Sequence, residues 1–69
     1  MSETLEVVVN GERARTRSMT LAELLVEFGY GDAKVATARN GDFVPQRKRD
    51  TEKLSGGDSI EIVAPRQGG

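Results

Sequence analysis

The sequence predicts an α+β domain in which one helix packs across a single β-sheet. Three observations lead to this class. Short runs of β-branched residues are separated by turn signals, which is typical of strands. One segment, residues 21–28, has the periodicity of an amphipathic helix. A helix this short is not stable alone in water, so we expect it to lie on the sheet formed by the strands.

A hairpin opens the chain, with a strand over residues 5–9 and a return strand over residues 12–17. The turn between them is Asn10-Gly11, the pair preferred in two-residue hairpin turns because both positions need positive φ. Alternation places Leu5, Val7 and Val9 on one face of the first strand, with Glu6 and Val8 on the other. In the return strand, one face carries Arg13, Arg15 and Arg17, and we expect it to be solvated.

Residues 21–28 carry clear helix signals. Thr20 is a favoured N-cap, and Glu23 three residues later completes a capping box. The apolar stripe then follows at helical spacing: Leu21, Leu24, Leu25 and Phe28. Gly29 is placed to end the helix.

Three further strands are predicted over residues 35–39, 42–44 and 59–63. Asn40-Gly41 is a second hairpin turn, and Pro45 ends the short strand after it. The small side chains of Ala36 and Ala38 favour a close approach of the helix to that face. The basic run at residues 46–49 is expected to be a solvated loop. These patterns leave the order of the strands in the sheet open.

One small core is expected to form between the helix and the sheet. Its predicted members are large or small apolar residues on the inward faces: Leu5, Val7, Val9, Leu21, Leu24, Leu25, Phe28, Val35 or Ala36, Ala38, Leu54, Ile60 and Ile62.

Composition restricts the function. With 69 residues the chain is predicted to be one domain spanning residues 1–69, too small for a roomy enzyme cleft. It contains no cysteine and no histidine, so a thiol nucleophile, a zinc-cysteine site and the commonest acid-base side chain are excluded. The net charge is −1 and few aromatics are present, which disfavours a nucleic-acid partner. No segment reaches the ~20 apolar residues of a membrane span, and no signal peptide is indicated, so we expect a cytoplasmic protein.

The last six residues, 64–69, form the candidate functional segment. Pro65 cannot donate to a sheet, so it should end the last strand, and the segment contains no apolar anchor. Six extended residues reach roughly 20 Å, enough to thread into another protein's active site. We therefore predict a flexible tail whose reactive group is the carboxylate of Gly69. The alternative is an ordinary frayed terminus.

Several stretches together resemble the thiamine-biosynthesis sulfur carrier family (ThiS). They are Asn40-Gly41-Asp42-Phe43-Val44-Pro45, Leu54 with Gly57-Asp58, the run Ile60-Glu61-Ile62-Val63, and the ending Gln67-Gly68-Gly69. The resemblance covers nearly the whole chain from Leu5. It implies the ubiquitin-like β-grasp fold, with one helix across a mixed four- to five-stranded sheet and a flexible Gly-Gly tail.

The resemblance also implies a mechanism in which the chain is a co-substrate and has no catalytic residue of its own. An adenylyltransferase of the ubiquitin-activating type (ThiF-like) would use ATP to adenylate Gly69. A cysteine desulfurase route would then supply the sulfur of a C-terminal thiocarboxylate, which a thiazole synthase (ThiG-like) consumes. Arg66, Gln67 and Gly68 would enter the partner's active site with Gly69. No bound cofactor or metal is implied for the carrier itself.

A carrier protein must also be recognised and bound by its partners. Alternation places Val8 and Val63 on the sheet face opposite the helix, where they would lie next to the tail. We hypothesise that they form an apolar docking patch for the activating enzyme, with Phe43 as a further member. The alternative is that single exposed valines have no role. Arg66 is a candidate to pair with an acidic groove on the partner.

Other readings of the same pattern are the small subunit of molybdopterin synthase, a ubiquitin-like protein modifier, and a β-grasp binding module without tail chemistry. The short chain and the Gln67-Gly68-Gly69 ending favour the thiazole carrier among these.

Overall fold

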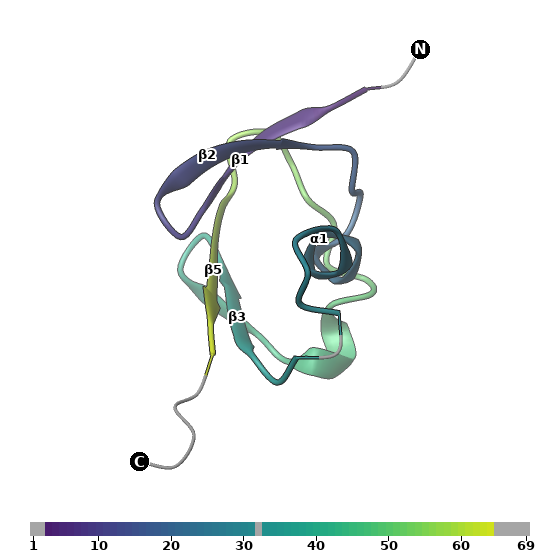
Figure 1. The fold of residues 1–69 in the computed structure, drawn as a ribbon, viewed down its shortest axis with the longest axis vertical. Coiled ribbons are helices and arrows are strands. Elements are labelled where there is room, and N and C mark those ends of the chain that lie inside the picture. The colour runs from purple at the N-terminus through teal and green to yellow at the C-terminus, as the bar shows by residue number, and fades with distance from the viewer. Residues whose placement is uncertain (1–2, 32, 65–69) are drawn as a thin grey trace.

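The computed structural model describes residues 3–31 and 33–64. Its elements follow the predicted order, and Figure 1 shows the single helix on one side of the sheet. They are β1 (Leu5–Val9), β2 (Glu12–Thr16), α1 (Leu21–Glu27), β3 (Ala36–Arg39), β4 (Asp42–Val44), a short 3-10 helix η1 (Gln46–Lys48) and β5 (Ser59–Val63).

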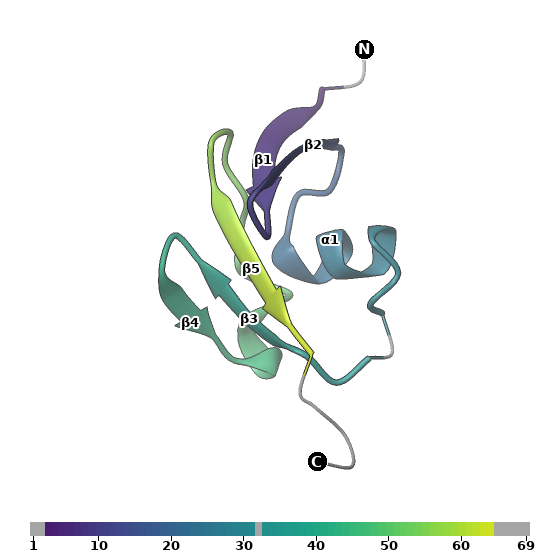
Figure 2. The same cartoon turned by 60° about the vertical axis from the view of Figure 1, so that its left-hand side comes forward.

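The five strands form one mixed sheet in the order β2-β1-β5-β3-β4. The last strand in sequence, β5, is therefore the central one, as Figure 2 shows. It runs parallel to β1 and antiparallel to β3. This arrangement confirms the predicted α+β sheet and supplies the strand order that the sequence patterns left open.

Both Asn-Gly pairs form the predicted hairpin turns. The φ angles are 52° at Asn10 and 87° at Gly11, and 53° and 86° at Asn40 and Gly41. Positive φ at both central residues is the geometry in which the turn matches the right-handed twist of the strands it joins. Asparagine and glycine reach this region at least cost, which explains why these two pairs mark the turns.

The helix α1 begins as its capping signals predict. The Thr20 hydroxyl accepts from the Glu23 N–H at 3.2 Å, and the Glu23 carboxylate accepts from the Met19 N–H at 2.7 Å. The loop after η1 completes the cap, since carbonyls of Arg49 and Glu52 accept from the N–H groups of Ala22 and Leu21. The first N–H groups of α1, which have no partner inside the helix, are thus satisfied.

At its other end α1 stops at Gly29, whose φ is +89°. The Gly29 N–H donates to the Val26 carbonyl and the Tyr30 N–H to the Leu25 carbonyl. This pair of bonds is the Schellman motif, in which a glycine in the left-handed region ends a helix.

The core lies between α1 and the sheet, and most of its predicted members are buried. The buried apolar residues are Val7, Val9, Leu21, Leu24, Leu25, Val44, Leu54, Ile60 and Ile62. Three predictions need correction. Phe28 is exposed because it follows the last turn of α1, Leu5 is half-buried at the start of β1, and Val44 is an additional core member.

The predicted face of β3 is wrong. Ala36 is exposed and Ala38 half-buried on the face away from α1, whereas Thr37 between them is almost fully buried. Register explains this, because Thr37 lies opposite Ile62 of β5 and Val44 of β4. A threonine is acceptable there because its hydroxyl donates to the Val44 carbonyl at 2.9 Å.

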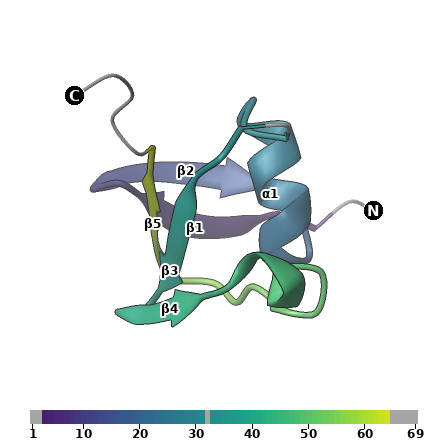
Figure 3. The same cartoon turned by 90° about the horizontal axis from the view of Figure 1, so that it is seen from below.

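The basic run is not a uniformly solvated loop. Residues 46–48 form η1, which follows β4 and lies below α1 in Figure 3. Arg47 and Lys48 are exposed, as expected, but Arg49 is only 9% exposed. Its Nε donates to the Thr37 hydroxyl at 3.0 Å and its guanidinium also donates to the Val35 carbonyl at 2.6 Å.

Candidate functional site

The candidate site is the end of β5, from which the chain continues into its last residues. Val63, the last residue of β5, lies opposite Ala36 of β3. Because β5 is the central strand, the chain leaves the middle of the sheet and not an edge. β5 ends at Val63, and Pro65, which was predicted to end this strand, lies outside the described residues.

The side chain of Asn10 holds this end of β5. Its Oδ1 accepts from the Ile62 N–H at 2.8 Å, and its Nδ2 donates to the Ile62 carbonyl at 3.1 Å. The backbone of β1 has already turned away at this level, so the Asn10 amide takes the place of a further strand residue beside β5. The sequence identified Asn10 only as a turn residue.

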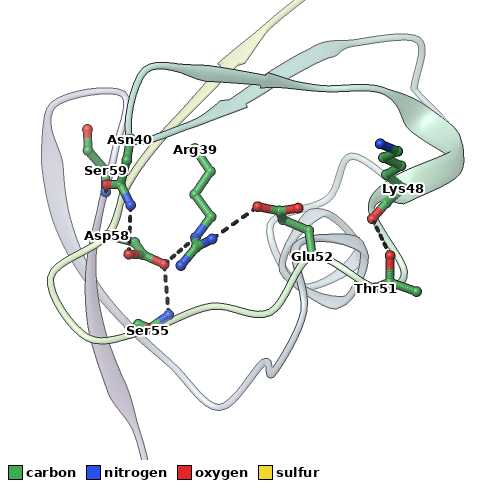
Figure 4. A network of polar contacts seen from close by, with 8 residues as sticks. All are labelled: Arg39, Asn40, Lys48, Thr51, Glu52, Ser55, Asp58 and Ser59. Carbon is green, nitrogen blue, oxygen red and sulfur yellow. Dashed lines mark hydrogen bonds and ion pairs between the residues drawn. The ribbon is translucent and has the colours of Figure 1, made fainter.

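A polar network holds the other end of β5, as Figure 4 shows. The Asp58 carboxylate accepts from Arg39 Nε at 2.7 Å, from Asn40 Nδ2 at 3.0 Å and from the Ser55 N–H at 2.7 Å. Arg39 also pairs with Glu52 at 3.0 Å. The Asn40 Oδ1 accepts from the Ser59 N–H at 2.9 Å. The asparagines of both hairpin turns therefore bind backbone groups of β5.

These contacts set the charge state of Asp58, which is only 5% exposed. Burial alone raises the pKa of Asp58, but the hydrogen bonds from Arg39, Asn40 and the Ser55 N–H together outweigh it, so the pKa lies below its ordinary value. The same pair raises the pKa of Arg39, chiefly through the hydrogen bond to Asp58 and then through that to Glu52. Both groups are therefore charged at neutral pH, and Arg39 forms ion pairs with Asp58 and with Glu52.

The three predicted docking residues lie on the sheet face opposite α1. Val63 is 60% exposed and Phe43 69% exposed, while Val8 is half-buried. Register places Phe43 opposite Ala38, Ala38 opposite Glu61, and Val63 opposite Ala36. We call the four apolar residues Phe43, Ala38, Ala36 and Val63 the open-face patch.

Val8 does not lie beside the end of β5, contrary to the prediction. It lies opposite Ser59 at the start of β5, four residues from Val63 and thus about 13 Å away along the strand. The prediction failed because alternation gives the face of a residue but not its position along the neighbouring strand, which depends on the parallel register of β1 and β5.

A groove of about 670 Å³ lies beside the end of β5. We call it the exit groove. Its described lining residues come from the loop before β3, from β3, from the segment around η1 and from β5: Gly31, Ala33, Lys34, Val35, Ala36, Gln46, Arg49 and Val63. The open-face patch and the exit groove share Ala36 and Val63. Sequence reasoning missed this groove, because Arg49 was assigned to the solvent.

The predicted tail residues Arg66, Gln67, Gly68 and Gly69 lie outside the described residues. Within residues 3–31 and 33–64, no helix is long and apolar enough to cross a membrane.

A single short helix on a five-stranded mixed sheet, with the last strand at its centre, defines a protein of the ubiquitin-like β-grasp class. The sequence model of the ThiS family matches residues 7–69. The chain belongs to the ThiS family, and this confirms the resemblance found in its motifs.

Two comparisons extend this result. The chain is similar to the crystal structure of a thiamine biosynthesis protein (ThiS) from Geobacter metallireducens, with a TM-score of 0.80 at 23% identity over 94% of this chain and all of the other. At that identity the likeness confirms the fold. This chain is also 41% identical, over 61 residues and 87% of its own length, to a protein named thiazole synthase from Paramagnetospirillum magneticum (strain ATCC 700264 / AMB-1). The matched region spans only 19% of that longer protein.

Proposed function

We propose that this chain carries sulfur on the carboxyl group of Gly69 and delivers it to the thiazole ring formed in thiamine biosynthesis. The observation that carries the proposal is the family match, which extends through the Gln67-Gly68-Gly69 ending. The position of β5 supports it, since a central strand gives the last residues a rigid base. The tail chemistry itself is inferred from these two observations.

The first step is activation. A C-terminal carboxylate is ionised at neutral pH, since its ordinary pKa is about 3.3–3.7. An anionic carboxylate is a poor electrophile, so it must first gain a leaving group. An adenylyltransferase of the ubiquitin-activating type joins the Gly69 carboxylate to the α-phosphate of ATP and releases pyrophosphate. The product is an acyl adenylate whose leaving group is AMP.

The second step brings the sulfur. A protein persulfide, formed by a cysteine desulfurase, attacks the acyl carbon and displaces AMP to give an acyl disulfide. A thiol then reduces this disulfide and releases the carrier as a thiocarboxylate. Gly68 and Gly69 suit these steps because they place no side chain beside the acyl carbon.

The carrier contributes no nucleophile or general base to this scheme. Its sequence contains no cysteine or histidine, and its ion pair of Arg39 and Asp58 lies at the far end of β5 from the tail. The chain therefore acts as a co-substrate whose body is recognised while its end reacts. The open-face patch is the proposed docking surface for the activating enzyme, because it adjoins the last residue of β5.

A thiazole synthase is the proposed acceptor of the sulfur. The similarity to a longer protein named thiazole synthase supports this choice of partner. The rival sulfur pathway, molybdopterin synthesis, uses the same chemistry at a Gly-Gly end, so only a cellular test separates the two.

Deletion of the gene in its host provides that test. The proposal predicts a strain that requires thiamine, grows when the thiazole precursor is supplied, and retains enzymes that depend on molybdenum cofactor. Loss of molybdenum cofactor with normal thiamine synthesis would contradict it and indicate a molybdopterin synthase subunit. Covalent conjugates of the chain with other proteins, without any thiocarboxylate, would indicate a protein modifier.

A further inference from the structure

The exit groove holds a cation that the sulfur chemistry does not use. Arg49 is 9% exposed, yet both of its side-chain hydrogen bonds go to neutral acceptors, the Thr37 hydroxyl and the Val35 carbonyl. The ion pairs formed among the described residues all belong to Arg39. No carboxylate in this part of the chain therefore lies within 4.0 Å of the Arg49 guanidinium.

A nearly buried cation without a counter-charge is costly, because it has lost most of its hydration. A guanidinium also has five N–H donors in a planar fork. The two hydrogen bonds of Arg49 leave N–H donors that face solvent, since no buried side-chain nitrogen or oxygen among the described residues lacks a hydrogen-bond partner. The Arg49 side chain lines the exit groove. An oxyanion that entered the groove would replace water at these donors and bring the negative charge that the described residues do not supply within 4.0 Å.

The other residues that line the groove indicate which chemical group would carry this anion. Val35, Ala36 and Val63 provide apolar walls, and Lys34 adds a second cation. The described residues that line the exit groove include no carboxylate. Asp50 lines a neighbouring hollow that shares Arg49 and Gln46 with the groove, and it forms no ion pair with Arg49 within 4.0 Å. A charged head next to apolar atoms is the pattern of an acidic side chain presented by a folded partner.

We propose that the exit groove binds an acidic side chain of a partner protein, whose carboxylate pairs with Arg49 while its apolar neighbours contact Val35 and Val63. The groove adjoins the last residue of β5, so a protein seated there would hold the carrier at the base of its tail. The identification of this partner as the activating enzyme rests on the proposed function, whereas the carboxylate site itself does not.

The first test uses the whole chain and two blocked peptides, acetyl-Val-Glu-Val-amide and acetyl-Val-Gln-Val-amide. Their binding is followed through the backbone amide resonances of Lys34, Ala36 and Val63. We expect saturable shifts with the Glu peptide at concentrations up to about 10 mM, and a dissociation constant at least about tenfold higher for the Gln peptide. Absence of saturation with the Glu peptide, or equal binding of both, would overturn the proposal.

Variants then locate the site. Arg49→Gln should weaken binding of the Glu peptide about tenfold, because it removes a charge-assisted hydrogen bond. Arg49→Lys keeps the positive charge but not the planar fork of donors, so its affinity for the Glu peptide should lie between those of the wild type and Arg49→Gln. Arg47→Gln is the matched control, since Arg47 is exposed on η1 and does not line the groove. If Arg49→Gln does not fold, the comparison of the two peptides on the wild-type chain still decides the question.

Two further arms identify the source of the anion. If inorganic phosphate shifts the same resonances as strongly as the Glu peptide, the site takes free phosphate and the proposal is wrong. If the Glu peptide binds only after the Gly69 carboxylate has been converted to an amide, the occupant is the chain's own end, and the proposal is also wrong.

The activating enzyme provides the final arm. With that enzyme, Arg49→Gln should raise the KM for the carrier about tenfold at an unchanged kcat. An unchanged KM would remove the activating enzyme as the partner. Thiocarboxylate formation by the wild-type chain is measured separately, so failure of the proposed function and failure of the groove are distinguishable.

Discussion

Asn10 shows how one side chain can serve a turn and a neighbouring strand together. Its backbone adopts the positive φ of the hairpin turn, while its amide forms two hydrogen bonds with Ile62 of β5. The turn would be satisfied by glycine, but the strand requires an amide with one donor and one acceptor. Asparagine is the side chain that meets both requirements at this length.

Substitution of Asn10 separates these two contributions. Asn10→Gly keeps the turn and removes the two hydrogen bonds, so we expect a loss of about 1–3 kcal/mol in the free energy of unfolding. Asn10→Ala should cost about 1 kcal/mol more, because alanine is strained at positive φ. Urea unfolding followed by circular dichroism measures both values. Equal stability of Asn10→Gly and the wild type would show that the contacts with Ile62 contribute nothing.

Asp58 provides a second prediction at this scale, through the dependence of stability on pH. Its pKa is lower in the folded chain than in the unfolded one, so its contribution is present above the unfolded value of about 3.9 and is lost as the pH falls through the folded value. In Asp58→Asn one of the two carboxylate oxygens becomes an NH₂ group. That NH₂ group then faces either the Asn40 Nδ2 donor or the donors of Arg39 and Ser55, so a hydrogen bond is lost in each orientation. We expect a loss of about 1–3 kcal/mol at pH 7.

That difference between the wild type and Asp58→Asn should shrink as the pH is lowered below about 4, where the unfolded carboxylate gains its proton, and it should be lost as the pH falls through the lower pKa of the folded chain. Urea unfolding at a series of pH values measures it. Glu12→Gln is the control, because Glu12 is exposed and forms no ion pair among the described residues. A difference that stays constant down to pH 2 would contradict the assigned role of the Asp58 charge.

Residue-level prediction from sequence failed where a distant partner decides the environment. Ala36 and Ala38 were expected to face the helix, but Thr37 between them is the buried residue, because Val44 and Arg49 satisfy its hydroxyl inside the protein. Arg49 was assigned to a solvated run because it is charged. Both residues are buried by contacts across 7 and 12 positions of sequence, which neither alternation nor local charge reveals.

At the scale of elements, local signals were sufficient for existence and type. The capping box at Thr20 and Glu23, the glycine at position 29 and the two Asn-Gly turns each specify a structure within a few residues of themselves. The helix and all five strands therefore appear within a residue or so of their predicted bounds. The order of strands depends on the long-range pairing of β1 with β5, and η1 has no strong local signal, so neither was predicted.

The open-face patch leads to a prediction for β5. Val63→Asp places a charge in the patch at a position that is 60% exposed, so the fold should tolerate it. We expect the KM of the activating enzyme for the carrier to rise about tenfold, because a buried apolar contact becomes an unpaired charge in the complex. The kinetics of pyrophosphate release measure this effect.

Met19→Asp is the matched control for Val63→Asp. Met19 is similarly exposed, at 63%, but it precedes α1 and belongs neither to the open-face patch nor to the lining of the exit groove, so its substitution should leave the KM unchanged. Urea unfolding shows whether both variants remain folded. An unchanged KM for Val63→Asp, or an equal rise for Met19→Asp, would contradict docking through the open-face patch.

At the scale of the whole molecule, β5 is fixed from both ends and on both sides. Asn10 holds its end, Asn40 and the Asp58 network hold its start, and β1 and β3 flank it. This last strand is thus held at both ends and flanked on both sides, and in the sequence it is followed by the family's Gly-Gly ending. We infer that the folded domain provides a rigid base that partner proteins bind while the C-terminus reacts.

Intact-protein mass spectrometry tests this account most directly. The chain is incubated with the activating enzyme, ATP, a cysteine desulfurase with cysteine, and a thiol, in parallel with a chain that lacks Gly69. We predict that the full chain gains the mass of an oxygen-to-sulfur exchange, located at Gly69, and that the trimmed chain folds normally but gains none. Exchange on the trimmed chain, or no exchange on the full chain with an active enzyme set, would contradict the central claim.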